Sequence, residues 1–491
     1  MKPFLKRLRI DWYLAVLIVI FGFLFFFRMH WPNLGSWDEA WYGSIAREMA
    51  KSGDFMHSNW NGKPFYDHPP MGFWIMALTY KIFGISEFST RLPSVVLGIL
   101  SIILVYLTGT ELFKKKAVGF AAALMLGTSV WYVIRVRSGN LDSPFVFFYI
   151  LTIYLALKSV KNIKLFPLVG LAFGSLMMTK TLVGISALPV MGVIMLPQIL
   201  KIRKSMLWLL GGIATFCIVV LPWYINHFQS YPDFIDHHFL KIGTRDKTLE
   251  SYFTLNYTLP LFYLHMGIRK WYYLWILSVG SLIVTLRCIK RNTFIILFWN
   301  AVVLYPFLTT DQTHIWHLIP VYVPLSLVTA YGLWELGNLI LTVFKHVPVP
   351  AARKLIKKYL TETVVTTGYL FAIICIAAIQ IKVFYTEVIP TARYITDDVA
   401  IALKAAKYDK TIYLDDDFLP MAVFYSGKFM TQMSFELEER HTLVNLFKSN
   451  EKNFVVITRS WAVQNLDNEN LEYQILDENN SFAIVTRPEQ Q

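Results

Sequence analysis

The sequence predicts a polytopic α-helical membrane protein that carries a small α/β domain at its C-terminal end. Of the 491 residues, 55% are hydrophobic and 16% aromatic, and the mean hydropathy is +0.46. This composition is too apolar for a soluble domain of this length. Many apolar runs are also long enough to cross the roughly 30 Å hydrocarbon core of a bilayer. Only residues 391–491 change to short, strand-like runs, so we expect a membrane domain over 1–390 and a separate domain after it.

About eleven apolar segments are candidate transmembrane helices. They cover 11–27, 92–112, 117–134, 143–157, 165–181, 182–200, 206–226, 271–286, 293–309, 317–340 and 363–386. The first segment continues into aromatic residues, and no small-residue cleavage site follows it, so we expect a permanent span and not a cleavable signal. Cys217, Cys288 and Cys375 lie in or beside spans and predict no disulfide framework.

The net charge of +13 does not indicate nucleic-acid binding, because the basic residues cluster in alternate short loops. The clusters lie at 1–9, 114–116, 158–164, 201–204, 287–291 and 345–358. With eleven spans all of them fall on one side, which the positive-inside rule makes the cytoplasm. The large polar pieces then lie outside: the loop 28–91, the loop 227–270 and everything after 387. This predicts a protein of the inner (plasma) membrane with an extracytoplasmic C-terminal domain.

The C-terminal domain is predicted from four strand-like runs, "TIYL" (411–414), "FVVIT" (454–458), "YQILDE" (473–478) and "SFAIVTR" (481–487). Helices are expected near 396–407 and 434–449. The acidic run at 415–417 is typical of residues that follow a strand and cap a helix, and the domain is too small for a nucleotide-sugar fold.

The outer loop 28–91 begins with two adjacent acids, Asp38 and Glu39. Ser36 and Glu39 have the S-x-x-E spacing of a capping box, which predicts that Ser36 is the N-cap of a helix and that Glu39 bonds back to its amide. In this interpretation Glu39 is structural and tolerates Gln. It leaves Asp38 unexplained.

A helix is expected from Trp37 to about Lys51, ended by Gly53 at the C′ position. Apolar side chains recur at every fourth position of this helix and form one stripe. They are Trp37, Trp41, Ile45 and Met49. The stripe predicts a helix that lies along the membrane interface, with Asp38 at the border of the apolar face.

More polar residues lie at the outer ends of other spans. Asp67 and His68 precede a double proline, which holds them in an extended segment. Asp142 also suits an N-cap of the fourth span, and Lys180 also suits snorkelling to the interface. The remaining residues are Arg135, Arg137, His237, His238, Arg245 and Lys247. Polar groups that gather at one face of an apolar bundle predict a functional cavity.

Several sequence blocks carry a resemblance to a known family. They are "WDEAWYGSIAREMAKSGDF", "NGKPFYDHPPMGFWIMALTYKIFGISEFSTRLPS", "LDSPFVF", "MTKTLVG" and "LIPVYVPLSLVTAYG". In order and spacing they resemble the polyprenyl-phosphate-dependent glycosyltransferases of the GT-C fold, the family that holds protein O-mannosyltransferases and the lipid A aminoarabinose transferase. The resemblance covers most of the membrane part.

The resemblance implies roles for individual residues. Asp38 would be the catalytic carboxylate, supported by Glu39 and Asp142, and Lys180 would contact the donor phosphate. Asp67 would help to hold a divalent metal ion or the donor; with His237 and His238 it forms the candidate metal site. Trp41 and His68 stand where some members have Arg and Lys, so the phosphate charge would fall to protonated His68, Arg137 or Arg245.

These residue types suit an inverting transfer of a sugar from a polyprenyl-phosphate donor to a hydroxyl or phosphate of a lipid, glycan or protein acceptor. The reaction needs a base for the acceptor and positive charge near the departing phosphate. The alternative is a multi-span transporter or lipid-handling protein. A transporter usually places ionisable residues near the middle of its spans, whereas these acids lie at outer ends.

Overall fold

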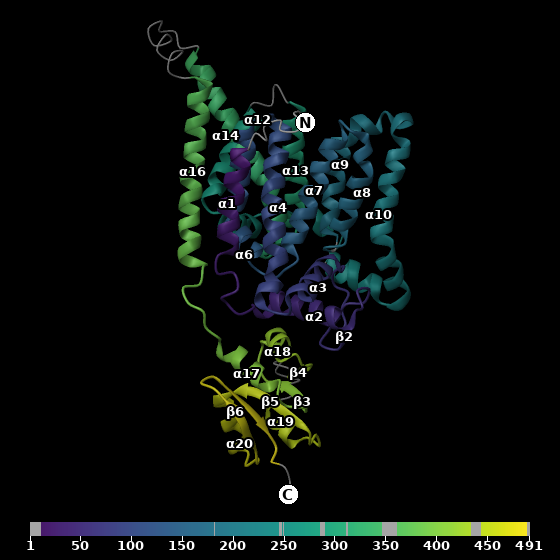
Figure 1. Ribbon diagram of the computed structural model, residues 1–491, viewed down its shortest axis with the longest axis vertical. Helices are drawn as coiled ribbons and strands as arrows, with labels where there is room; N and C mark the ends of the chain where they lie inside the picture. Colours follow the sequence, from purple (N-terminus) through teal and green to yellow (C-terminus); the bar gives the residue numbers. More distant parts are fainter. Residues whose placement is uncertain are drawn as a thin grey trace, which may run out of the picture.

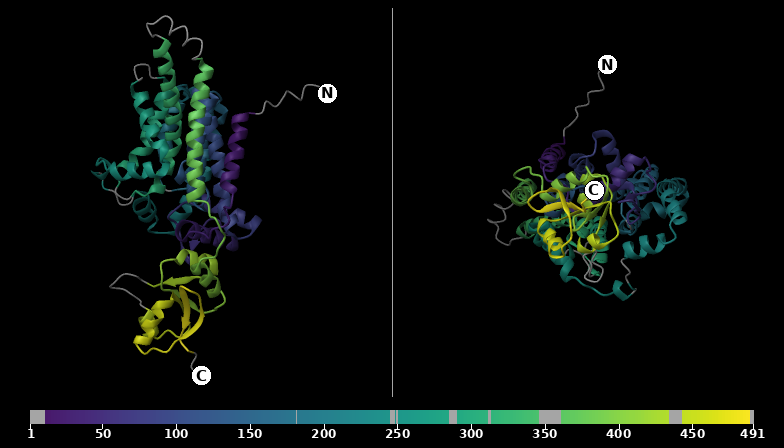
Figure 2. Two further views of the ribbon diagram at one scale, coloured as in Figure 1. Left: turned by 90° about the vertical axis from the view of Figure 1, so that its left-hand side faces the viewer. Right: turned by 90° about the horizontal axis from the view of Figure 1, so that it is seen from below.

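The computed structural model describes residues 11–180, 182–244, 248, 250–284, 290–310, 313–345, 361–433 and 443–488. Long helices run side by side along the longest axis of the molecule, and the small C-terminal domain lies at one end of them (Figure 1). Between the two lie the short helices of the first outer loop, which touch both parts (Figure 2). The bundle and the C-terminal domain therefore meet through this loop.

Each predicted span coincides with a helix or a pair of helices. These are α1 (Trp12–Phe26), α4 (Glu87–Phe113), α5 (Lys116–Gly127) with α6 (Val130–Val136), α7 (Asp142–Ser159), α8 (Phe166–Met177), α9 (Ala187–Ile199), α10 (Ile202–Ser230), α12 (Lys270–Val284), α13 (Arg291–Leu308), α14 (Ile319–Lys345) and α16 (Glu362–Glu387). Within the described residues, five helical segments are long and apolar enough to cross a membrane, or six if the bent pair α5–α6 is one span. The chain is thus a helical membrane protein, and the count of eleven spans stays a prediction.

The predicted span 117–134 is bent, because α5 and α6 meet at an angle of 71°. Two hydroxyls at the break donate to carbonyls of α5: Thr128 to Leu124 and Ser129 to Met125, both at 2.7 Å. Such side-chain bonds compete with the helix ladder and favour a bend. The bend turns α6, and Arg135 with it, towards the first outer loop.

The first outer loop contains η1 (Ser36–Ala40), a single π-turn, followed by α2 (Trp41–Ser52) and α3 (Met71–Phe83), with the strand pair β1 (Asn59–Trp60) and β2 (Lys63–Pro64) between them. α2 ends as predicted, because Gly53 has φ 75° and its N–H bonds to the carbonyl of Met49 at 3.1 Å. Most of the apolar stripe packs on protein, and the position of α2 along the membrane interface stays a prediction. Ile45 and Met49 are buried in a core shared with the C-terminal domain, and only Trp37 is largely exposed.

The C-terminal domain is a five-stranded sheet in the order β4-β3-β5-β7-β6. The strands are β3 (Thr411–Leu414), β4 (Met430–Gln432), β5 (Phe454–Arg459), β6 (Gln474–Glu478) and β7 (Phe482–Thr486), and the helices are α17 (Asp397–Ala405), α18 (Leu419–Ser426), α19 (Leu443–Lys448) and α20 (Gln464–Asn468). β3 is parallel to β4 and β5, and β7 is antiparallel to β5 and β6. All four predicted strands coincide with observed ones, and β4 was not expected. Most of the predicted helix 434–449 lies outside the described residues.

Two further helical segments connect long helices of the bundle. η4 (Ile235–Thr244) follows α10, and α11 (Thr258–Ile268) precedes α12. η4 brings two histidines against the segment before α3, since His238 Nδ1 lies 2.8 Å from the carbonyl of Tyr66.

Candidate active site

Four charged side chains form one connected row where the helices meet the first outer loop. Arg135 donates through Nη2 to Asp38 Oδ2 and through Nε to Asp142 Oδ2, each at 2.5 Å. Lys180 Nζ donates to the other oxygen of Asp142, also at 2.5 Å. The row therefore runs Asp38, Arg135, Asp142, Lys180 with alternating charge, and we call it the charged row.

Four separate elements supply the charged row. Asp38 lies in η1, Arg135 in α6, Asp142 at the start of α7, and Lys180 in the turn after α8. The turn after α8 is tied to the first loop, because the N–H of Met71 bonds to the carbonyl of Met178 at 2.9 Å. Residues far apart in the sequence are thereby held at one place.

The structure supports neither an N-cap role for Asp142 nor snorkelling of Lys180 to the interface. Asp142 is the first residue inside α7, and its N-cap is Leu141, which has no side-chain cap. Its carboxylate instead serves Arg135 and Lys180. Lys180 is only 19% exposed and points to this buried acid, whereas a snorkelling lysine would extend to the interface.

Exposure separates the two acids of the charged row. The side chain of Asp38 is 28% exposed, whereas that of Asp142 is 3% exposed. Within the described part of the chain, Oδ1 of Asp38 has no hydrogen-bond partner, while both oxygens of Asp142 are engaged. Asp38 is the acid that an incoming molecule can reach.

Glu39 faces away from the charged row and is fully bonded. Arg91 of α4 donates to Oε1 at 2.7 Å and to Oε2 at 2.8 Å, and the N–H groups of Gly35 and Gly139 each donate at 2.8 Å. Burial acts to raise the pKa of the Glu39 carboxyl, but Arg91 and the two N–H groups outweigh it and the pKa is lowered. Glu39 is a buried anion that holds the loop.

The predicted capping box between Ser36 and Glu39 is therefore not formed. The N-cap of η1 is Gly35, and Glu39 bonds to the amide of Gly35 and not to that of Ser36. The hydroxyl of Ser36 is buried without a hydrogen-bond partner. The tertiary partner Arg91 determines where Glu39 points, and the local S-x-x-E spacing does not reveal it.

His68 lies beside the charged row but carries no positive charge at neutral pH. Its ring packs on Tyr42, with 6.1 Å between ring centroids. Burial and the nearby positive charge of Lys180 together lower the pKa of the His68 imidazole to about 3. A neutral ring can still donate one hydrogen bond, and the role of a protonated His68 toward a phosphate stays a prediction.

The candidate metal ligands lie close together but are otherwise engaged. Asp67 Oδ1 lies 2.6 Å from His237 Nε2, and His238 is buried with Nδ1 against the carbonyl of Tyr66. In the described ranges no group of three His, Cys, Asp or Glu side chains is placed to hold a metal ion. The geometry of these residues supports a hydrogen-bonded pair, Asp67 with His237.

Of the two other predicted phosphate ligands, Arg137 lies outside the charged row. Arg137 donates to the carbonyls of Leu24 and Phe25 at 2.8 and 3.0 Å, which closes the end of α1. Arg245 lies outside the described residues. The arginine of the site is Arg135. Residues two apart on a helix point in widely different directions, so only one of these two arginines can face the site, and the sequence does not say which.

Tyr42 is a further site residue that the sequence reading missed. It follows Asp38 by four residues, the spacing that puts two side chains on one helical face. Burial raises the pKa of the Tyr42 phenol well above its ordinary value, and the negative charge of Asp38 adds to this effect. Tyr42 therefore stays protonated beside Asp38.

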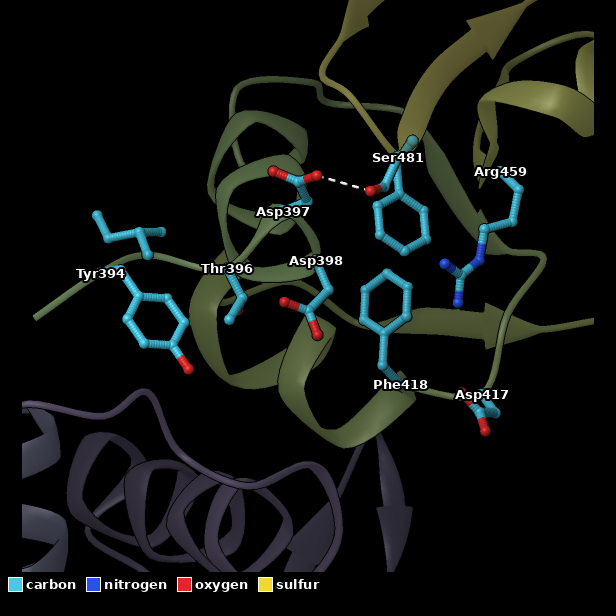
Figure 3. Close-up of a pocket in the computed structure, with 10 residues that line it drawn as sticks. Tyr394, Thr396, Asp397, Asp398, Asp417, Phe418, Arg459 and Ser481 are labelled. Atoms are coloured by element: carbon cyan, nitrogen blue, oxygen red, sulfur yellow. Dashed lines mark hydrogen bonds between the residues drawn. The ribbon is translucent and has the colours of Figure 1, made fainter. Parts of the chain in front are cut away.

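The acidic run of the C-terminal domain, residues 415–417, is not part of the charged row. Asp415 accepts a hydrogen bond from Thr458 at 2.8 Å, and Asp416 pairs with Arg459. Asp417 lines a shallow hollow beside Arg459, in which Asp397 accepts a hydrogen bond from Ser481 at 2.6 Å (Figure 3). These acids bond within their own domain, in agreement with a structural role.

Part of the chain matches one protein family, and its sequence is similar to several known proteins. Residues 67–225 match the model of the family described as dolichyl-phosphate-mannose-protein mannosyltransferase. An uncharacterized protein of Aquifex aeolicus is 28% identical over 244 residues, 49% of this chain and 48% of that protein. The undecaprenyl phosphate-alpha-4-amino-4-deoxy-L-arabinose arabinosyl transferase of Yersinia enterocolitica is 27% identical over 345 residues, 66% of this chain and 60% of that protein. The enzyme of the same name from Pseudomonas savastanoi is 28% identical over 233 residues, 46% of this chain and 43% of that protein. The matches thus span between 43% and 60% of these relatives' own length.

Two solved structures share the fold. ArnT from Cupriavidus metallidurans, bound to undecaprenyl phosphate, aligns with a TM-score of 0.66 at 16% identity over 97% of this chain and 99% of that one. The archaeal oligosaccharyltransferase AglB from Archaeoglobus fulgidus aligns with a TM-score of 0.55 at 10% identity over 94% of this chain and 68% of that one. Together with the family match, which includes Asp142 and Lys180, these findings confirm the resemblance: the chain is a relative of the polyprenyl-phosphate-dependent glycosyltransferases of the GT-C fold.

Proposed function

We propose that the chain transfers a sugar from a polyprenyl-phosphate donor to an acceptor at the outer face of the membrane. One observation carries the proposal: a reachable carboxylate, Asp38, and two cations, Arg135 and Lys180, lie in one charged row at the end of an apolar bundle. Charged groups are expensive in such a bundle unless they serve a function. The names of the relatives, which act on an undecaprenyl-phosphate sugar, support the same class of donor.

In the proposed reaction Asp38 is the general base. A hydroxyl of the acceptor attacks the anomeric carbon of the sugar, and its proton passes to Asp38. The bond between that carbon and the phosphate oxygen breaks, and the phosphate leaves with the electron pair. A single displacement of this kind inverts the anomeric carbon. Arg135 fixes one oxygen of Asp38, which leaves Oδ1 to accept the proton.

The cations of the charged row receive the departing phosphate. Lys180 is bonded to Asp142, and the donor phosphate would share this ammonium group with the acid. Arg135 has further N–H donors besides the two that hold the acids, because a guanidinium carries five. Fixed positive charge at the place where negative charge develops is an effective way to stabilise a transition state.

The orientation of the protein follows from its charges. Two of the basic clusters lie at the bundle end opposite the C-terminal domain: Lys115 pairs with Glu362 at the start of α16, and Lys158 and Lys161 pair with Glu111 near the end of α4. By the positive-inside rule that end is cytoplasmic, and the charged row lies outside. The lipid tail of the donor would stay in the bilayer while its head group reaches the row.

The test uses the purified full-length protein in lipid nanodiscs. It is incubated with undecaprenyl phosphate that carries either 4-amino-4-deoxy-L-arabinose or mannose, and with lipid, glycan and peptide acceptors in turn. Release of undecaprenyl phosphate together with a glycosylated acceptor supports the proposal. Asp38→Asn should lower the rate by about 10²- to 10⁴-fold, as expected for a lost general base.

The matched control is Asp409→Asn, since Asp409 is a fully exposed acid of the C-terminal domain. Its rate should equal that of the unaltered protein. Full activity of Asp38→Asn would contradict the mechanism, and no transfer from either donor to any acceptor would contradict this choice of substrates.

A further inference from the structure

The C-terminal domain is built directly onto the segment that carries Asp38. Its helix α18 lies beside α2 (Figure 1) and packs on both η1 and α2. Phe424 of α18 contacts Gly43 of α2. A Cβ atom added at Gly43 would lie 3.0 Å from Cε2 of Phe424 and 3.1 Å from the hydroxyl of Tyr80, so a larger residue there would crowd this contact. Gly43 lies five residues after Asp38.

Tyr425, the next residue of α18, makes two hydrogen bonds outside its own domain. Its hydroxyl accepts from the N–H of Leu34 at 2.9 Å and donates to Glu87 Oε1 at 3.0 Å. Leu34 is buried and directly precedes Gly35, the N-cap of η1. A single hydroxyl thus joins the backbone before Asp38 to the first turn of α4.

Three more polar ties cross the same junction. Arg47 of α2 donates to the carbonyls of Val423 and Phe424 at 3.0 and 2.8 Å, which satisfies the last turn of α18. Asn33 donates to the hydroxyl of Thr396 at 2.9 Å, so this N-cap residue of α17 bonds to the loop and not to its own helix. Asn61 bonds both to the carbonyl of Met430 at 2.7 Å and to its N–H at 2.9 Å.

The opposite side of the segment is held by α4. Arg91, one turn after Glu87, binds Glu39 and also donates to the carbonyls of Met29, Pro32 and Asn33 at 2.7 to 2.9 Å. Residues 29–39 are therefore held by hydrogen bonds from α4 on one side and from the C-terminal domain on the other. Apolar packing alone tolerates small shifts, whereas satisfied polar networks specify one geometry.

We propose that the C-terminal domain is a clamp that holds the catalytic carboxylate in place, and that Tyr425 is its positioning residue. The clamp, which rests on the function proposed above for Asp38, acts on the backbone of residues 33–40 and not on the donor. Loss of the Tyr425 hydroxyl loosens η1 and lets Asp38 move relative to Arg135 and the acceptor. Donor binding at Lys180 is unaffected.

The first experiment compares Tyr425→Phe with Tyr408→Phe in the full-length protein. Tyr408 is the matched control, because its hydroxyl bonds to the carbonyl of Leu476 within the C-terminal domain and does not touch the loop. Amide hydrogen exchange of peptides from residues 33–47 should rise about 2- to 10-fold in Tyr425→Phe, the range expected for one lost hydrogen bond. It should not change in Tyr408→Phe.

The second readout is the transfer rate divided by the number of donor-binding sites in the sample. For Tyr425→Phe this rate should fall by about 2- to 10-fold while the donor Kd stays the same. A merely structural defect would lower the number of donor-binding sites and leave the rate per site unchanged. Unchanged exchange together with an unchanged rate per site would overturn the clamp.

A second pair of variants reaches the same junction by a steric route. Gly43→Ala should press on Phe424 and raise exchange over residues 33–47. Gly280→Ala is its control, because a Cβ there meets nothing within 4 Å. If the unaltered protein transfers no sugar, the proposed function fails, yet the exchange experiment still decides whether the domain clamps the loop.

Discussion

Arg91 holds Glu39 through both carboxylate oxygens, although 52 residues separate them in the sequence. The pair is buried, and the two remaining bonds to Glu39 come from backbone N–H groups on either side of it. Of the two adjacent acids, Glu39 builds the site and Asp38 is free to act in it. The first prediction follows from this division.

Glu39→Gln should lower the free energy of unfolding by about 3 kcal/mol, because it leaves a buried guanidinium without its counter-charge. A capping role would instead tolerate Gln. Chemical unfolding in detergent measures the change, and Glu362→Gln is the control. Glu362 is 68% exposed in its pair with Lys115, so its loss should cost at most about 1 kcal/mol. Equal stability of the two variants would contradict the prediction.

Arg135→Lys should lower the transfer rate at least about tenfold, since a single ammonium cannot reproduce the fork that reaches Asp38 and Asp142 together. Arg137→Lys, two residues on, should keep its rate per folded molecule, because Arg137 serves the end of α1. Steady-state kinetics on both variants measure the difference. Reversed results would mean that Arg137 is the arginine of the site.

Lys180→Ala should weaken donor binding about 10- to 100-fold, the loss expected for a charge-assisted bond to a phosphate. Lys164→Ala is a suitable control, because Lys164 precedes α8 and Lys180 follows it at the opposite end. Binding of a fluorescent polyprenyl phosphate measures the affinity. Equal affinity in the two variants would show that Lys180 does not bind the donor phosphate.

Stability should fall with pH because of His68. The folded protein holds the pKa of His68 at about 3, below the ordinary 6.5 that we assign to the unfolded chain. Between these values the unfolded chain binds more protons, so stability decreases as pH falls below about 6.5, by up to about 1.4 kcal/mol per pH unit. His68→Gln should flatten the dependence of thermal unfolding on pH from 7 to 5, and substitution of the exposed His30 should not.

Reporter fusions test the orientation. A reporter after Gln491 and one inserted at Gly62 should both report the outside, and one at Lys115 should report the cytoplasm. Gly62 and the C-terminal domain lie on one side in the structure, because the neighbouring Asn61 bonds to Met430. A reporter at Gln491 that reports the cytoplasm would contradict the proposed orientation of the active site.

The positions of the helices could be read from the sequence, because apolar composition and length in a membrane protein determine them almost alone. Asp38, Asp142 and Lys180 could be found as charged residues at helix ends, and Asp142 and Lys180 also fall within the family match. The choice of Arg135 over Arg137 and the partner of Glu39 could not be predicted. The first depends on the angle of the bend after Gly127, and the second on a contact between α4 and a distant loop. Local patterns do not contain such tertiary partners.

The charged row sums to zero, since two acids alternate with two cations. A polyprenyl-phosphate sugar is a phosphodiester with one negative charge, whereas the polyprenyl phosphate left after transfer is a monoester with a charge near −1.5 to −2 at neutral pH. In the proposed reaction Asp38 takes up the proton of the acceptor, so the row carries one net positive charge when the phosphate gains its additional negative charge. Once Asp38 releases this proton the row is neutral again, and we expect it to hold the spent lipid less tightly than a strongly basic pocket would, so that the next donor can enter.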